Sequence, residues 1–189
     1  MLALASAAPM AFITSVEIRE QPLVGLLAEL GGSVFVERRN KFSVKSEINQ
    51  ITKLLLDGFN LALFAEGTTS NGECVLPFKN TLIQAAINAE AVLVPVCINY
   101  LSIDGEKPSP ANRDKVFFYG DMGFVTHIGR LLRTQSIEME CRFLEAIPLT
   151  RHDDRKDIAR RAHRAISENY KSIAMDPIRQ QLEPIANTR

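Results

Sequence analysis

The sequence that decides the fold class is LALFAEGTTSNG, residues 61–72, in which an apolar strand runs directly into a polar loop. Leu61–Phe64 is a continuous apolar run, which is typical of a strand covered on both faces. Glu66 follows the carboxyl end of this strand, where α/β sheets usually bind their ligands. Gly67 permits a close turn, and Thr68–Ser70 supply hydroxyl and N–H groups that could hold an anion or a polar head group. From the residues alone, this ligand-binding loop and a hydrated loop in which Glu66 merely caps a helix are equally good interpretations.

A second short strand is predicted at Ser33–Glu37, directly before Arg38. If this strand runs parallel to Leu61–Phe64, Arg38 and Glu66 lie at the same edge of the sheet, and we expect them to share one anion pocket. An arginine fork is the natural clamp for a phosphate. The alternative is that Arg38 and its neighbour Arg39 mark a solvated strand exit.

Lys79 is a further candidate, because it precedes a helix that we predict at Thr81–Ala89. Its ammonium and the N-terminal end of that helix would together favour a negative ligand group. By itself this signal is weak.

The rest of the chain alternates helices with strands. Apolar spacing predicts amphipathic helices at Val44–Asp57 and Asp154–Ile173. Further helices are expected at 21–30, 81–89 and 124–132, and further strands at 92–98, 116–119 and 137–143. This alternation predicts an α/β fold with a central, largely parallel or mixed sheet flanked by helices. We expect one domain over residues 1–175 and a loosely ordered tail over residues 176–189.

The composition argues against several classes of protein. Among the 189 residues, 22 are Lys or Arg and 22 are Asp or Glu, so the formal charge is zero and a dedicated nucleic-acid binder is disfavoured. The three cysteines are far apart, which disfavours a disulfide framework or a zinc ribbon and favours a reducing compartment. No uninterrupted apolar run reaches the roughly 18–20 residues that span a bilayer. The first twelve residues resemble a signal peptide only superficially, since they lack a positive charge and contain Pro9.

Four motifs, in this order and spacing, resemble those of the phospholipid/glycerol acyltransferase family, which includes the lysophosphatidic acid acyltransferases. The family pattern G-x-x-F-V-x-R matches Gly32–Arg38, and the F-P-E-G-T-R-S block matches Phe64–Ser70. A P-F-K segment matches Pro77–Lys79, and a V-P-V strand matches Val94–Val96, which accounts for a proline inside a predicted strand. The resemblance extends from about Phe12 to Ile147.

The resemblance implies an activity and a set of roles. Family members move a fatty acyl group from acyl-CoA or acyl carrier protein to the free hydroxyl of a lysophospholipid, such as 1-acylglycerol-3-phosphate, in phospholipid biosynthesis or remodelling. A histidine, oriented by an aspartate five positions later, takes the hydroxyl proton. By position, acceptor binding falls on Arg38, Glu66, Gly67 and Thr68, and Lys79 is added as a candidate. No bound cofactor, metal or nucleic acid is implied, and the membrane surface, at its cytoplasmic face, is an expected partner.

One family motif is missing, because no histidine precedes His127. In the family the H-x-x-x-x-D block lies a few tens of residues before the F-V-x-R strand, so we expect a truncated chain whose residues before Pro9 form the helix that normally follows the block. His152 and Asp157 repeat the spacing, but they lie after every matched motif, where acidic residues suit a helix N-terminus, and we regard them as a decoy. The alternative function is a catalytically inactive domain that binds lipid or a protein partner. An in-frame N-H-x4-D-like block upstream of Met1 would favour the enzyme, and a stop codon there would favour the alternative.

Two substitutions bear on the acceptor. Thr69 stands where many family members have arginine, and Ala65 where they have proline. Loss of a guanidinium weakens recognition of a doubly charged phosphomonoester. Some members that use other acceptors, such as lysophosphatidylcholine, also carry Thr-Thr at this place. We therefore expect an acceptor other than lysophosphatidic acid.

Overall fold

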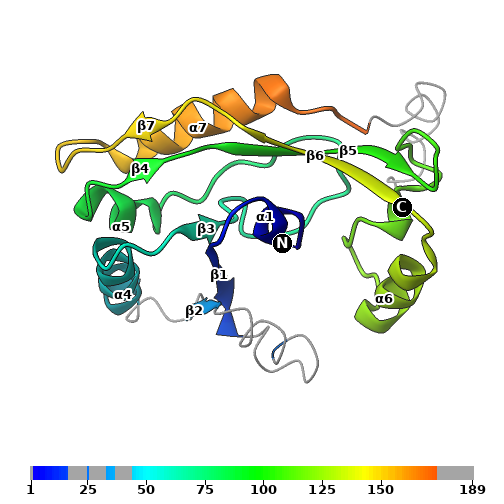
Figure 1. Ribbon diagram of the computed structural model, residues 1–189, viewed down its shortest axis with the longest axis horizontal. Coiled ribbons are helices and arrows are strands. Elements are labelled where there is room, and N and C mark those ends of the chain that lie inside the picture. The colour runs from blue at the N-terminus through cyan, green and yellow to red at the C-terminus, as the bar shows by residue number, and fades with distance from the viewer. Residues whose placement is uncertain (1, 17–24, 26–32, 37–43, 174–189) are drawn as a thin grey trace, which may run out of the picture.

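A computed structural model describes residues 2–16, 25, 33–36 and 44–173, and it has the predicted α/β fold (Figure 1). The helices are α1 (Leu2–Ala7), α4 (Val44–Leu56), α5 (Ile83–Asn88), α6 (Phe124–Arg133) and α7 (Arg155–Asn169), with a 3-10 turn at Arg113–Lys115. The strands are β1 (Ala11–Ser15), β2 (Val34–Val36), β3 (Leu61–Leu63), β4 (Val92–Leu93), β5 (Val96–Ile103), β6 (Ile137–Phe143) and β7 (Ile147–Pro148).

Three parallel strands form the sheet that carries the candidate site. β1 lies between β2 and β3, and Ile13 is paired with both Val34 and Leu63. The carboxyl ends of β2 and β3 therefore lie at the same edge of the sheet, as the strand arrangement expected from the sequence requires. The central strand, β1, is absent from the predicted elements, although Ile13 and Thr14 are β-branched residues that favour a strand.

Two antiparallel pairs complete the mixed architecture: β5 with β6, and β4 with β7. The prediction of one continuous strand at 92–98 is wrong, because Pro95 separates β4 from β5. Proline has no N–H to donate to a strand ladder. Its carbonyl oxygen instead accepts a hydrogen bond from the N–H of Leu144 at 2.9 Å.

The strand predicted at Val116–Tyr119 is also wrong. The N–H groups of Val116 and Phe117 both donate to the carbonyl oxygen of Arg113, which closes a turn. The apolar side chains of this segment serve as anchors instead. The Phe117 ring packs on Tyr100, with 4.8 Å between ring centroids, and it lies 2.7 Å from the place that a Cβ on Gly72 would occupy. Because Gly72 also has a φ of +80°, only glycine fits there.

Other boundaries follow the predictions closely. α4 ends at Leu56, and α7 ends at Asn169, earlier than the predicted Ile173. The helix predicted at 21–30 falls almost wholly outside the described residues, and the tail at 176–189 lies entirely outside them. Within the described ranges, no helix is both long and apolar enough to cross a membrane.

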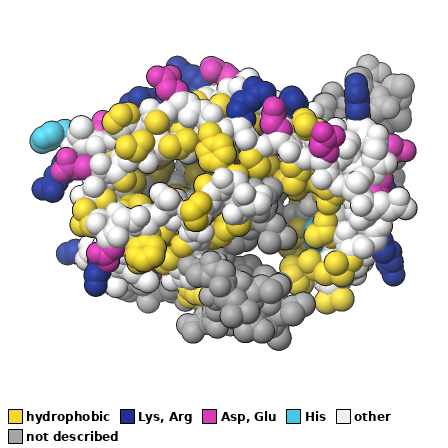
Figure 2. All heavy atoms as spheres, in the orientation of Figure 1, with side chains coloured by type: hydrophobic (Ala, Val, Ile, Leu, Met, Phe, Trp, Pro, Cys, Tyr) yellow, Lys and Arg dark blue, Asp and Glu magenta, His cyan; other side chains and the backbone are white. Residues whose placement is uncertain are grey.

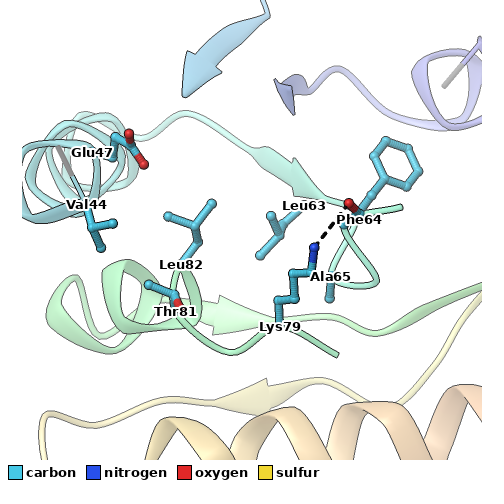
Figure 3. Close-up of a pocket in the computed structure, with 9 residues that line it drawn as sticks. Val44, Glu47, Leu63, Phe64, Ala65, Lys79, Thr81 and Leu82 are labelled. Atoms are coloured by element: carbon cyan, nitrogen blue, oxygen red, sulfur yellow. Dashed lines mark hydrogen bonds between the residues drawn. The ribbon is translucent and has the colours of Figure 1, made fainter. Parts of the chain in front are cut away.

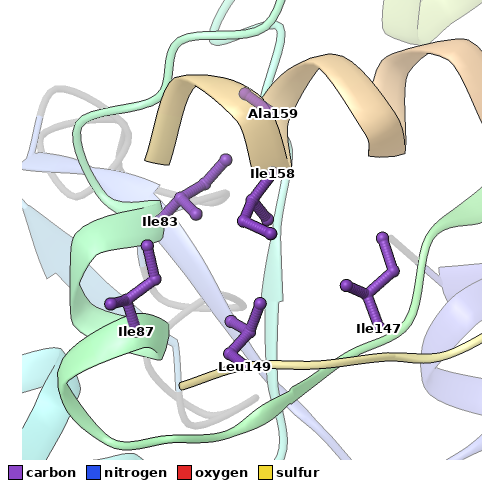
Figure 4. Close-up of a cluster of buried hydrophobic side chains, with 6 residues drawn as sticks. All are labelled: Ile83, Ile87, Ile147, Leu149, Ile158 and Ala159. Carbon is purple, nitrogen blue, oxygen red and sulfur yellow. The ribbon is translucent and has the colours of Figure 1, made fainter. Parts of the chain in front are cut away.

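The short helix α5 lies between two hydrophobic clusters and buries Ile83, Ala85 and Ile87, as its mainly apolar sequence predicts. Ala85 packs with residues of β1, β2 and α4. On another face of α5, Figure 4 shows a cluster that connects this helix to β7 and α7, formed by Ile83, Ile87, Ile147, Leu149, Ile158 and Ala159. In Figure 1, α7 lies on the far side of the β5–β6 pair from the parallel strands. Helix α5 therefore links the parallel sheet to the last helix.

Ile158→Ala is expected to lower the free energy of unfolding by about 2–4 kcal/mol, because this side chain is 1% exposed and its loss leaves a cavity between α5, β7 and α7. Ile158→Val removes one methylene and is expected to lower it by about 1 kcal/mol. Urea unfolding followed by circular dichroism measures both. Equal effects of the two variants would contradict the packing described here.

Candidate functional site

A pocket of about 180 Å³ lies where β3 ends, between the first turns of α4 and the segment that leads into α5 (Figure 3). Its walls are mainly hydrocarbon, and its charged groups are the carboxylate of Glu47 and the ammonium of Lys79. The lining residues are Val44, Glu47, Leu63, Phe64, Ala65, Gly67, Lys79, Thr81 and Leu82. The lining therefore combines a mainly apolar surface with one acidic and one basic residue.

Hydrogen bonds join the turn after β3 to the segment before α5. The N–H of Leu76 donates to Oε2 of Glu66 at 2.9 Å, and the N–H of Lys79 donates to the carbonyl oxygen of Ala65 at 2.8 Å. The Lys79 ammonium lies 3.4 Å from the carbonyl oxygen of Gly67, a long hydrogen bond that Figure 3 marks with a dashed line. Gly67 has a φ of +63°, and a Cβ there would lie 2.9 Å from Cδ of Lys79. This turn therefore requires glycine.

The structure thus brings Glu66, Gly67 and Lys79 together. One carboxylate oxygen of Glu66 stabilises the loop itself, because it accepts the hydrogen bond from Leu76 that holds this segment against the turn. Thr68 and Thr69 follow Gly67 and are exposed. Arg38 lies outside the described residues, and its convergence with Glu66 stays a prediction. The acceptor-binding roles of all these residues are likewise predictions.

The far end of the loop is held by a segment that follows α7, residues 170–173, which we call the C-terminal strap. The hydroxyl of Tyr170 donates to the carbonyl oxygen of Gly72 at 2.8 Å, and the N–H of Ile173 donates to the same oxygen at 3.0 Å. Ser172 Oγ donates to the carbonyl oxygen of Glu73. Arg113, which is largely buried, forms an ion pair of 2.8 Å with the Glu73 carboxylate. No sequence motif pointed to the contacts of the strap, which join residues about a hundred positions apart.

Asn99 on β5 fixes the position of the strap. Its side chain is 0% exposed and makes hydrogen bonds in several directions. Nδ2 donates to the carbonyl oxygen of Asn169 at 3.1 Å and to Glu140 at 3.2 Å, while Oδ1 accepts from the N–H of Lys171 at 2.8 Å. The end of α7 is therefore bound to β5 by one buried amide.

The three histidines have other surroundings. His127, which belongs to α6, packs on Phe118, and His152 is exposed in the turn before α7. Nε2 of His163 lies 3.3 Å from the carbonyl oxygen of Val75. In the part of the chain that the structure describes, none of them forms a hydrogen bond to residues 66–68.

The pair His152 and Asp157 lies at the start of α7. Oδ1 of Asp157 accepts from Arg160 at 2.7 Å, and Asp154 caps the helix by accepting from the N–H groups of Lys156 and Asp157. The described contacts of the Asp157 side chain are therefore with its own helix. The described side chains also contain no group of three or more His, Cys, Asp and Glu that could hold a metal ion.

The family profile and the similar proteins that match this chain are all named as acyltransferases. The profile of a family described as Acyltransferase matches residues 1–99. The chain is 33% identical to a lyso-ornithine lipid O-acyltransferase of Rhizobium meliloti, over 95% of this chain and 62% of that protein. It is 37% identical to the protein of the same name from Pseudomonas aeruginosa, over 86% of this chain and 60% of that protein. With a 1-acyl-sn-glycerol-3-phosphate acyltransferase of Neisseria gonorrhoeae the identity is 26%, over 93% of this chain and 68% of that protein.

Among solved structures, the fold is similar to that of the 1-acyl-sn-glycerophosphate (LPA) acyltransferase PlsC from Thermotoga maritima. The TM-score is 0.54 and the identity 16%, over 86% of this chain and 56% of that one. This likeness bears on the fold alone. The chain spans about 60% of the length of the lyso-ornithine lipid acyltransferases named above.

The Tyr170 hydroxyl provides a test of the strap. Burial and, to a lesser extent, the Glu66 carboxylate raise the pKa of Tyr170 to about 12. In the unfolded chain the pKa is about 10. The protonated Tyr170 hydroxyl therefore contributes its full share of the folding stability below pH about 10, and this contribution is lost as the pH rises to about 12.

We expect Tyr170→Phe to be about 1 kcal/mol less stable than the wild type at neutral pH, because the hydrogen bond to Gly72 is lost. Between pH about 10 and 12 the wild type should lose stability more steeply than the variant, so that the two converge. Denaturant unfolding across this range, with tyrosinate absorbance of the native protein, measures both effects. A constant difference in stability at every pH would contradict the assignment.

Proposed function

This chain belongs to the acyltransferase family, and on that premise we propose that it serves the transfer of a fatty acyl group to the free hydroxyl of a lysolipid with a zwitterionic head group. The donor is acyl-CoA or acyl carrier protein. The proposed acceptor is lyso-ornithine lipid or a lysolipid of the same chemistry, whose head group carries a carboxylate and an ammonium.

The observation that carries this choice is the pair of opposite charges in the pocket wall. Lys79 offers an ammonium to a carboxylate, and Glu47 lines the same pocket with a carboxylate that suits an ammonium. A phosphomonoester has about two negative charges, which the single ammonium in the pocket wall balances less well than it balances one carboxylate. Thr69, in place of an arginine, also removes a phosphate-binding group from the neighbouring loop.

The size of the pocket supports a head group as its occupant. Pockets for drug-sized ligands have volumes of roughly 300–1,000 Å³. At about 180 Å³, this pocket has room for only part of a lysolipid, so the fatty chain of the acceptor lies outside it.

In the proposed reaction, the described residues of this chain bind the lysolipid acceptor. The acceptor hydroxyl oxygen forms a bond to the thioester carbonyl carbon, the carbon–sulfur bond breaks, and the proton passes through a general base to the leaving thiolate. The family resemblance gives the base to a histidine of an H-x4-D block before the F-V-x-R strand, and no histidine precedes His127 in these 189 residues. Lys79 and the turn fixed by Glu66 would hold the acceptor for that attack. Because the acceptor is a membrane lipid and the donor is soluble in water, we place the reaction at the cytoplasmic face of a membrane.

An inactive lipid-binding or protein-binding domain is the second candidate, and the surroundings of the histidines favour it. None of the three is hydrogen-bonded to residues 66–68 in the described part of the chain. Acyl transfer by protein expressed from the complete reading frame separates the candidates. Turnover supports the enzyme, whereas lysolipid binding with no turnover supports the inactive domain.

Thr69→Arg is expected to shift the acceptor preference toward lysophosphatidic acid. Thr69 is exposed, so an arginine can be accommodated, and its guanidinium would add a charged hydrogen bond to a phosphate. In protein from the complete reading frame, we expect kcat/KM for lysophosphatidic acid, relative to lyso-ornithine lipid, to rise about tenfold. Thr69→Gln is the uncharged control. A wild type that already prefers lysophosphatidic acid would refute the proposed acceptor.

Lys79→Gln is expected to raise KM for lyso-ornithine lipid about tenfold while changing kcat less, because a charge-assisted contact to the head group is lost. Lys79→Arg keeps the charge and should retain most of the affinity. An uncharged acceptor such as monoacylglycerol provides the comparison. If Lys79→Gln impaired turnover of both acceptors equally, the lysine would not be reading the head group.

A further inference from the structure

Helix α6 exposes apolar side chains and buries a histidine. Val125 is 83% exposed and Leu132 is 81% exposed, whereas His127 is only 7% exposed. Val125 and Leu132 are seven residues apart and lie on one face of the helix, next to Phe124, which is 38% exposed. In Figure 2, hydrophobic side chains gather at the lower right, where Figure 1 shows α6. Ile128 and Leu131 are half-buried, so α6 packs one apolar face against its own domain and leaves a second one exposed.

The buried side of α6 shows what fixes this orientation. Phe118 packs on His127, with 5.4 Å between ring centroids, and on Phe124 at 6.0 Å in an edge-to-face contact. Nδ1 of His127 is buried and has no hydrogen-bond partner among the described residues. The helix therefore keeps a polar atom without a hydrogen bond inside while Val125 and Leu132 are exposed to water, which indicates that this second apolar face has another partner.

The charges of α6 indicate what that partner is. The helix sequence, FVTHIGRLLR, contains Arg130 and Arg133 and no acidic residue. Both arginines are exposed, and neither forms an ion pair within the part of the chain that the structure describes. An apolar stripe beside exposed cations is the pattern of a helix that lies in the interface of an anionic bilayer.

We propose that α6 is a membrane-docking helix, which inserts Val125 and Leu132 into the head-group region of an anionic bilayer while Arg130 and Arg133 contact lipid phosphates. The inference extends the proposed function, since a lysolipid acceptor lies in a membrane. It stands on the surface of α6 alone, and binding to vesicles without any acyl donor or lysolipid tests it separately from catalysis.

The chain contains no tryptophan, so a single tryptophan reports its own surroundings. In Leu132→Trp, we expect the emission to shift to the blue when vesicles of phosphatidylcholine and phosphatidylglycerol in equal parts are added, and brominated lipid to quench it. Val92→Trp is the matched control, because Val92 is 62% exposed on β4, at the other end of the molecule in Figure 1. An unchanged spectrum for Leu132→Trp, or an equal shift in both variants, would overturn the proposal.

Charge variants test the two halves of the surface. Val125→Glu with Leu132→Glu is expected to weaken vesicle binding at least about tenfold, and Val92→Glu to leave it unchanged. Arg130→Gln with Arg133→Gln is expected to weaken binding about tenfold for the phosphatidylglycerol vesicles and little for pure phosphatidylcholine. Because all four side chains are exposed, the fold should persist, which circular dichroism checks. If the glutamate pair instead dissolved a dimer and left vesicle binding intact, α6 would be a contact between two copies and the proposal would fail.

Discussion

The amide of Asn99 is the constraint on which the candidate site depends most. It is completely buried, so each of its donors or acceptors that lacked a partner would destabilise the folded protein by about 1–3 kcal/mol. These bonds are made by Glu140, by the carbonyl oxygen of Asn169 and by the N–H of Lys171. The observed placement of the end of α7 satisfies all three together. With α7 placed in this way, the Tyr170 hydroxyl can donate to the carbonyl oxygen of Gly72. A buried side chain of β5 thus helps to fix the loop that follows β3.

The candidate loop is consequently restrained at both ends and open in its middle. Near β3, the Glu66 carboxylate and the Ala65 carbonyl oxygen hold it to residues 76–79. At its far end the strap and Arg113 hold Gly72 and Glu73. Thr68 and Thr69 lie between these points and face solvent. A polar segment held in this way loses little conformational entropy when it binds a ligand, which is a physical basis for affinity in a site of few residues.

Local pattern was sufficient to predict elements whose surroundings agree with their own residues. The periodic apolar spacing at 44–57 predicts α4 to within one residue at each end, and the elements expected at 124–132 and 137–143 agree closely with α6 and β6. The position of Glu66 at a strand end was also readable, since a polar run follows an apolar one. The failures have tertiary causes: Val116–Tyr119 is apolar because Phe117 and Phe118 anchor other parts of the chain, not because it pairs with a strand. The strap could not be predicted, because its partner Gly72 is 98 residues away from Tyr170 and carries no sequence signal for that contact.

The strap has a consequence for the order in which a growing polypeptide acquires its structure. The ribosome releases the N-terminal part first, and domains begin to fold while synthesis continues. The parallel strands and α4 can therefore assemble early, but the carbonyl oxygen of Gly72 receives its donors only after Tyr170 and Ile173 have been added. Closing so long a connection is an inherently slow step in folding. The polar loop would thus reach its final shape as one of the last events, and a nascent chain interrupted within α7 would carry every loop residue without the fastening that holds them.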